Sequence, residues 1–199
     1  MKIFKENSYD IVRLYVNQLG IMIFSMLLYT AVGSFENESL SNSLSIFVSV
    51  FSICFYLVLV YYAVWEIGAK DKIRIDGGRM EPCKNKGLVM SLFANVPNFV
   101  LGLFSVVLMA LFLITGNDGV YAGFLIFNTI MRFHASMFLG AITAIVPTGI
   151  SQGAVDYVEF LIEAVLFTVF PMISVAVTHL AYRLGSQEKK IFSLFSANK

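Results

Sequence analysis

The sequence predicts an all-α integral membrane protein, built as a bundle of four or five transmembrane helices. Of its 199 residues, 58% are hydrophobic and 14% are charged, whereas a soluble domain is closer to half apolar and one quarter charged. The apolar residues also fall into long runs with almost no charge, and runs of about 18 or more such residues are typical of membrane spans. Inside hydrocarbon the backbone must satisfy its own polar groups, which favours helices.

Five apolar segments account for these runs. They are residues 14–35, 44–67, 88–115, 121–146 and 157–182. At a rise of about 1.5 Å per residue, each can cross a hydrocarbon core about 30 Å thick. The linkers between them are short, and the chain has no internal repeat and no low-complexity tract. We therefore expect a single transmembrane domain over residues 1–199.

Basic residues predict the orientation of the chain. They concentrate in the N-terminal segment, in the polar loop of residues 68–87 and in the C-terminal tail. Lys and Arg are enriched on the cytoplasmic side of membrane proteins. The N-terminus and the loop are therefore predicted to be cytoplasmic, and the protein is expected in the cell membrane. The turn at Asp76–Gly78 lies inside this loop.

The predicted side of the C-terminus leaves open whether the fourth segment crosses the membrane completely. Five complete crossings would place the C-terminus outside, but the tail contains Arg183, Lys189, Lys190 and Lys199. A cytoplasmic C-terminus requires residues 121–146 to be re-entrant, so that they enter and leave on the same side. The opposing observation is a polar stripe at helical spacing, which is typical of one unbroken helix; it comprises Asn128, Arg132, Ser136, Gly140 and Thr143. We favour the cytoplasmic C-terminus.

Ionisable and amide side chains inside the apolar segments are the candidate functional residues. Small residues and serines in membrane helices usually serve packing, but a charge near the bilayer centre costs roughly 2.5–3.5 kcal/mol and often marks a pathway or a site. We expect Glu163 or Glu159 to pair with Arg132, either as a structural ion pair or as part of a polar site. The predicted substrate or ion pathway comprises Asn95, Asn98, Arg132, His134, Asp156, Glu159 and Glu163. Its acidic residues outnumber its basic ones, which leaves a carboxyl group for a cation or a proton.

Two prolines lie inside apolar segments and predict kinks. Pro97 falls in the third segment and Pro171 falls near the middle of the fifth. Proline removes one backbone donor and bends or breaks a helix. Such kinks are common in membrane helices and are usually architectural.

Several classes of function are disfavoured by missing motifs. The sequence contains no GxGxxG, no GxxxxGK[ST] and no HExxH pattern, and its two cysteines, Cys54 and Cys83, do not have zinc-ligand spacing. We therefore predict no catalytic residue, no metal site and no cofactor, and an enzyme is disfavoured. A net charge of +1 gives no indication of nucleic-acid binding.

The sequence favours a small transporter or the membrane subunit of a transport complex. Its expected partners are the lipid bilayer and other membrane subunits or an ATPase. The alternative is a non-transporting membrane partner, such as an assembly factor, a sensor-linked subunit or an immunity-type protein. That protein would dock a partner or anionic lipid through the basic loop, with Arg74, Arg79, Lys84 and Lys86 as the contact residues. The least favoured hypothesis is an intramembrane enzyme that uses His134 with an acidic partner.

Overall fold

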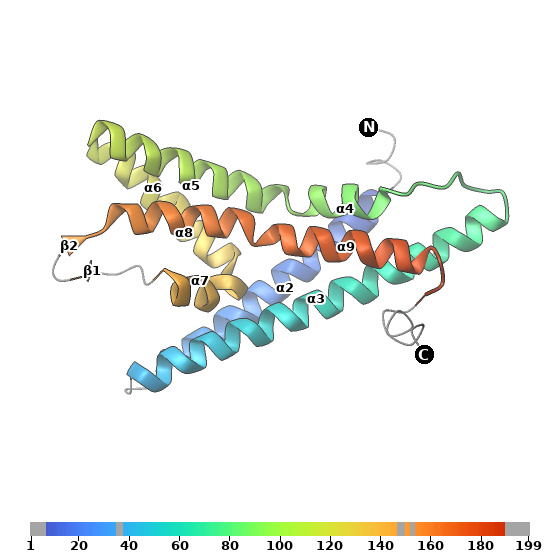
Figure 1. The fold of residues 1–199 in the computed structure, drawn as a ribbon, viewed down its shortest axis with the longest axis horizontal. Coiled ribbons are helices and arrows are strands. Elements are labelled where there is room, and N and C mark those ends of the chain that lie inside the picture. Colours follow the sequence, from blue (N-terminus) through green and yellow to red (C-terminus); the bar gives the residue numbers. More distant parts are fainter. Residues whose placement is uncertain (1–6, 35–37, 147–149, 152–153, 190–199) are drawn as a thin grey trace, which may run out of the picture. The chain divides into compact units, whose positions relative to one another are not determined.

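The computed structural model describes residues 7–34, 38–146, 150–151 and 154–189. These residues form helices almost throughout, as predicted (Figure 1). Four helical segments are long and apolar enough to cross a membrane: Ser8–Val32, Leu40–Asp76, Val96–Thr115 and Tyr157–Gly185. The described part of the chain is therefore all-helical, apart from one short β-pair, with four candidate membrane spans. The tail residues Lys190 and Lys199 lie outside the described residues.

The first two helices extend well beyond the apolar segments. Helix α2 spans Ser8–Val32 and α3 spans Glu38–Asp76. The prediction of a loop over residues 68–87 is wrong in its first half, because α3 continues for more than two turns past the apolar run. The helix ends at the predicted turn, where Gly78 has a φ of +67° that favours glycine. Only residues 77–85 form the connection to the next helix.

The third and fifth segments are each interrupted close to a proline, as the sequence predicted. The third divides into α4 (Lys86–Ala94) and α5 (Val96–Thr115), and the fifth into α8 (Tyr157–Val169) and α9 (Pro171–Gly185). Pro97 is the second residue of α5, and the other proline opens α9. The missing N–H is tolerated there, because the first turn of a helix has no internal acceptor for it.

The fourth segment is sharply bent rather than continuous. Helix α6 (Asp118–His134) is followed by the 3-10 turn η1 (Ser136–Phe138) and by the short helix α7 (Leu139–Ile145). The two parts are bent by 81°, so the alternative of one unbroken helix is wrong. A two-residue strand pair follows, in which β1 (Ile150–Ser151) is antiparallel to β2 (Ala154–Val155). Pro147 and the glycines of this connection lie outside the described residues.

Hydrogen bonds from α2 and α3 hold this bend in place. The hydroxyl of Ser136 donates to the carbonyl of Met22 at 2.9 Å. The Ser49 hydroxyl on α3 accepts from the Gly140 backbone N–H at 2.8 Å and is hydrogen-bonded to the Tyr29 hydroxyl at 2.6 Å. The first N–H groups of a helix lack internal acceptors. Ser49 therefore caps α7 from a different helix, which explains how the segment can break at residues 135–138, which include neither proline nor glycine.

The chain clusters into two compact units, each assembled from distant segments. Unit 1 comprises residues 1–17, 56–95 and 172–199, and unit 2 comprises residues 18–55 and 96–171. The boundaries fall inside α2 and α3 and at the breaks beside Pro97 and Pro171, so no flexible linker sequence marks them. The single-domain assignment of residues 1–199 stays a prediction.

Close helix packing in both units depends on glycine. In unit 2, α5 packs against α6 and α8, and a Cβ at Gly102 would lie 3.2 Å from the Thr168 Cα. In unit 1, a Cβ at Gly68 would lie 2.9 Å from the backbone nitrogen of Ser186, and one at Gly185 would lie 3.1 Å from the Trp65 Cα. Small residues let backbones approach where lipid provides no hydrophobic drive between helices.

Replacing Gly140 by alanine tests the close approach of α7 to α2 and α3. A Cβ there would collide with the Tyr29 hydroxyl and the Ser45 carbonyl. We expect Gly140→Ala to lower the free energy of unfolding by about 1–3 kcal/mol, the usual cost of overpacking. The measurement is reversible unfolding in mixed micelles. Gly20→Ala is the control, because a Cβ at that α2 position meets no atom within 4 Å; equal destabilisation by both changes would contradict the packing.

Candidate functional site

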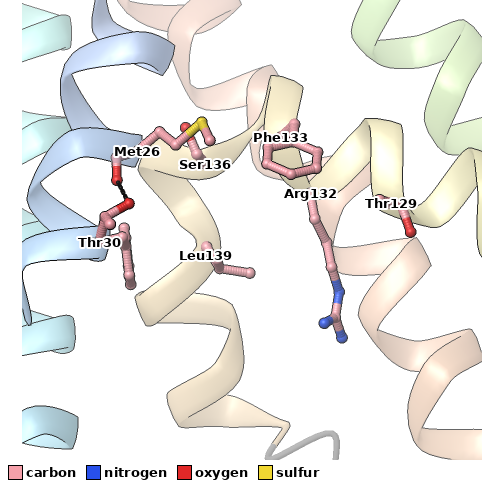
Figure 2. A pocket seen from close by; sticks show the side chains of 8 residues that line it. Met26, Thr30, Thr129, Arg132, Phe133, Ser136 and Leu139 are labelled. Atoms are coloured by element: carbon pink, nitrogen blue, oxygen red, sulfur yellow. Dashed lines mark hydrogen bonds between the residues drawn. The ribbon is translucent and has the colours of Figure 1, made fainter. Parts of the chain in front are cut away.

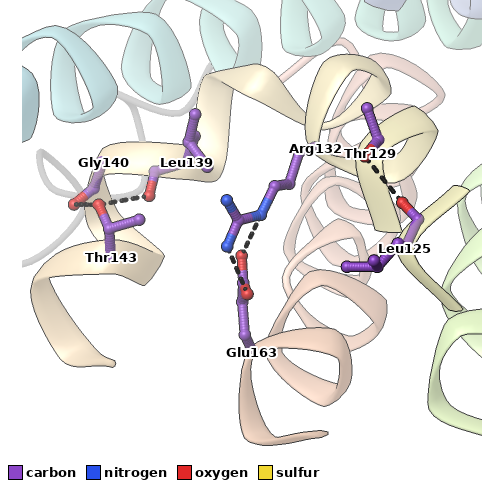
Figure 3. Close-up of polar contacts among 7 residues, drawn as sticks. All are labelled: Leu125, Thr129, Arg132, Leu139, Gly140, Thr143 and Glu163. Atoms are coloured by element: carbon purple, nitrogen blue, oxygen red, sulfur yellow. Dashed lines mark hydrogen bonds and ion pairs between the residues drawn. The ribbon is translucent and has the colours of Figure 1, made fainter. Parts of the chain in front are cut away.

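A buried ion pair joins α6 to α8 in unit 2. Arg132 approaches the carboxylate of Glu163 from one side, with Nη2 2.7 Å from Oε2 and Nε 2.7 Å from Oε1 (Figure 3). The Glu163 side chain is 0% exposed, whereas that of Arg132 is 34% exposed. The predicted pairing of Arg132 with an acidic residue of the fifth segment is confirmed. The Nη2–Oε2 contact is a charge-assisted hydrogen bond, which is stronger than a neutral one.

Local helix signals position the two partners. Helix α6 begins at the Asn117 cap, whose side chain accepts from the Gly119 N–H at 2.8 Å. Helix α8 begins at Asp156, whose carboxylate accepts from the Val158 N–H at 2.8 Å. Asp156 therefore lies at a helix N-terminus, where a negative charge is stabilised by the helix dipole. The structure gives this member of the predicted pathway a capping role at an exposed position.

Two further predicted residues lie in the same helices as the pair. Glu159 is one turn before Glu163 on α8, and its buried Oε2 has no hydrogen-bond partner among the described residues. His134 is the last residue of α6 and is buried. A buried carboxylate oxygen without a hydrogen bond is costly, so Glu159 Oε2 is a position in unit 2 where a further donor or a cation would be stabilised.

The two asparagines of the predicted pathway fall into different units. Asn98 is buried on α5 in unit 2. Asn95 ends α4 in unit 1, where its side-chain amide donates to the carbonyl of Ser91 at 2.9 Å and to the hydroxyl of Ser174 at 3.3 Å. Asn95 therefore serves the helix break and the contact between α4 and α9. The residues of the predicted pathway therefore do not all fall within one unit.

A cavity of about 350 Å³ lies beside the ion pair in unit 2. Arg132 forms part of its wall together with side chains from α2, α6, η1 and α7 (Figure 2). The lining is mostly apolar and includes four hydroxyls. All four donate to a backbone carbonyl, those of Tyr29, Thr30, Thr129 and Ser136. Because their protons are used, these hydroxyls offer lone pairs to a molecule in the cavity, while Arg132 places a positive charge in its wall.

Unit 1 contains a second buried ion pair that the sequence did not predict. The Asp71 carboxylate is 1% exposed and accepts from Lys86 Nζ at 2.6 Å and from the Tyr182 hydroxyl at 3.0 Å. Arg74 lies 3.6 Å from its other oxygen. The contact fastens α3, α4 and α9 to one another. A lone acid between Lys70 and Lys72 was the only signal for it in the sequence, and helix-surface acids in basic runs usually remain in water.

The predicted docking residues of the basic loop differ in accessibility. Arg79 and Lys84 are exposed and form no ion pair within the described residues. Arg74 is exposed beside Asp71. Lys86 is buried in its contact with Asp71, so three of the four residues, and not Lys86, are available at the surface.

Comparison with known proteins adds no identification. No protein family, no curated protein and no solved structure is similar to this chain. Within the described residues, no group of three or more His, Cys, Asp or Glu side chains could hold a metal ion. The helices define the chain as a candidate multi-pass membrane protein. The two buried ion pairs of its described residues, Arg132 with Glu163 and Lys86 with Asp71, are the features that bear most directly on its function.

A double-mutant cycle tests the energetic coupling of Arg132 and Glu163. Arg132→Met leaves Glu163 buried without its partner, and we expect a loss of about 3–5 kcal/mol in the free energy of unfolding. The loss for Glu163→Gln should be smaller, because Arg132 is one-third exposed. The double variant should lose less than the sum of the two single variants. Strict additivity in mixed-micelle unfolding would show that the two side chains do not interact.

Proposed function

We propose that the protein is a multi-pass membrane protein in which unit 2 provides a polar pathway for a proton or a small cation. It would act as a small transporter or as the membrane subunit of a transport complex. The observation that carries this proposal is the fully buried carboxylate of Glu163, which pairs with Arg132, a residue that lines a cavity at a broken helix. Buried charge in a membrane helix is expensive, and it usually marks a pathway or a site.

The charge balance of unit 2 supports a cation rather than an anion. Arg132 is the only basic residue among the described residues of this unit, and Glu163 neutralises it. Glu159 remains, with a buried oxygen that lacks a hydrogen-bond partner in the described structure. The hydroxyls that line the cavity add acceptors and no further positive charge. A proton or a small cation would satisfy Glu159, whereas an anion would compete with Glu163 for Arg132.

The bend between α6 and α7 supports a re-entrant fourth segment. Four crossings by the long helices place both chain ends on one side, which agrees with the basic N-terminal segment and tail. Helix α7 turns back toward the end of unit 2 where β1, β2 and the start of α8 lie (Figure 1). Non-helical backbone at membrane depth is tolerated where it is buried in protein or lines a cavity. The cavity beside η1 is such a place.

Cysteine labelling tests this topology. In a Cys54→Ser, Cys83→Ser background, single cysteines replace Asn117 before α6, Asp156 before α8, or Gln187 after α9. We expect the first two to react with a membrane-impermeant maleimide added outside right-side-out cells, and Gln187→Cys to react only after permeabilisation. Opposite sides for Asn117→Cys and Asp156→Cys would show that the fourth segment crosses completely.

Ion flux in proteoliposomes tests the pathway itself. With proton, Na⁺ or K⁺ gradients imposed in turn, we expect flux of one of these ions to fall at least tenfold in Glu159→Gln and Glu163→Gln. Asp118→Asn is the matched control, because this exposed acid lies in the first turn of α6 in the same unit. No flux above protein-free liposomes for the chain purified with its native partners, or equal flux in all variants, would contradict the proposal.

A second candidate function is that of a non-transporting membrane partner. It is favoured by Arg79 and Lys84, which are exposed in the connection of residues 77–85 and form no ion pair in the described part of the chain. Such a connection is too short to fold alone but can present charges to another protein. Co-purification in mild detergent separates the two functions, because loss of a stoichiometric partner on Arg79→Gln and Lys84→Gln would favour docking.

A further inference from the structure

A small cavity in unit 1 lies where two helices end together. Its volume is about 180 Å³, and it is bounded by the last turns of α3, by residues 82–84 of the connection and by the end of α9. Lys72 and Lys84 approach it from separate elements, and Tyr182 and Ser186 close its other side. The cavity is distinct from the one beside Arg132, which belongs to unit 2.

Two helices independently place this cavity in the headgroup layer. Lys72 lies five residues beyond Ile67, the last residue of the apolar run in α3, which is about 7.5 Å along the helix. Ser186 lies four residues beyond Tyr182, the end of the apolar run in α9, which is about 6 Å. The headgroup layer extends about 5–8 Å from the hydrocarbon core on each side.

The charge around the cavity is positive. The described residues of unit 1 include nine basic and six acidic side chains. Asp76 also lines the cavity and pairs with Lys72 at 2.9 Å, but this is an exposed contact within one helix and is weak. Lys84 forms no ion pair among the described residues. The nearby carboxylate of Asp71 already forms an ion pair with Lys86. A diester phosphate at this level would therefore meet two ammonium groups and one carboxylate, a local charge of +1.

We propose that this cavity binds the phosphate headgroup of an anionic phospholipid from the surrounding bilayer. Lys72 and Lys84 supply the charge, and the apolar side chains of Ile75 and Pro82 in the cavity wall contact the glycerol and the start of the acyl chains. The lipid would hold the connection of residues 77–85 against the ends of α3 and α9. This inference depends on the membrane location of the chain and not on its transport of an ion.

Native mass spectrometry of the full chain from mixed micelles tests the proposal. The probes are phosphatidylglycerol and phosphatidylcholine at equal concentration. We expect retained phosphatidylglycerol to exceed phosphatidylcholine, and Lys84→Gln or Lys72→Gln to reduce this preference about fivefold each, the factor that corresponds to about 1 kcal/mol per basic residue near a membrane. Lys70→Gln is the matched control, because this exposed α3 lysine pairs with Glu66 and does not line the cavity.

Cys83 provides a second readout, since its thiol lies in the cavity wall. In a Cys54→Ser background, phosphatidylglycerol should slow maleimide labelling of Cys83 and phosphatidylcholine should not. Equal retention of the two lipids, or a loss in Lys70→Gln as large as in Lys84→Gln, would overturn the proposal. Protection of Cys83 by inorganic phosphate to the same extent would also overturn it, because the cavity would then recognise a free anion. None of these readouts depends on ion flux, so they remain independent of the proposed pathway.

Discussion

Buried charge in an apolar helical chain must find its partner within the protein, and this constraint shapes both units. The Arg132–Glu163 pair meets it in unit 2, where a fully buried carboxylate receives two contacts from one guanidinium. Unit 1 meets it with Asp71, which accepts from a lysine and a tyrosine on two other elements. In both cases, leaving one partner alone would cost several kcal/mol. The helices that supply the partners are therefore held in a fixed register.

The same constraint explains the irregular backbone. Each break exposes N–H and C=O groups that water cannot reach in a membrane. At the bend after α6, the Ser49 hydroxyl of α3 accepts from the backbone of α7, and Ser136 in the bend fastens it to α2 by donating to the Met22 carbonyl. At the break after α4, the Asn95 side chain returns to the Ser91 carbonyl. Serine and asparagine positions that resemble ordinary packing residues thus determine where the helices can stop.

The charged residues of the protein are distributed unequally between the two units. Nearly all basic residues of the described chain belong to unit 1, whereas unit 2 has a single arginine and an excess of acids. A positive region at headgroup level suits contact with anionic lipid or a partner. An acidic interior with hydroxyl acceptors suits a proton or a cation. The proposed pathway and the proposed lipid site therefore follow from different parts of one charge distribution, and each can be tested without the other.

The sequence by itself determined the helical class, the apolar segments that form the long helices, the turn at Gly78, the breaks beside Pro97 and Pro171, and the pairing of Arg132 with an acidic residue of the fifth segment. These features depend on composition, on local backbone chemistry and on the cost of a lone charge, all of which can be read along the chain. Only the tertiary structure decided the bend after His134, because the hydrogen bond that the Gly140 N–H donates to the Ser49 hydroxyl of α3 takes the place of a local helix breaker. It also buried Lys86 beside Asp71, since side chains fifteen residues apart meet only when α3 and α4 pack together. The structure also decided that Asp156 caps α8. Periodicity along the sequence places a residue on one face of a helix, but it does not show at which residue the helix begins.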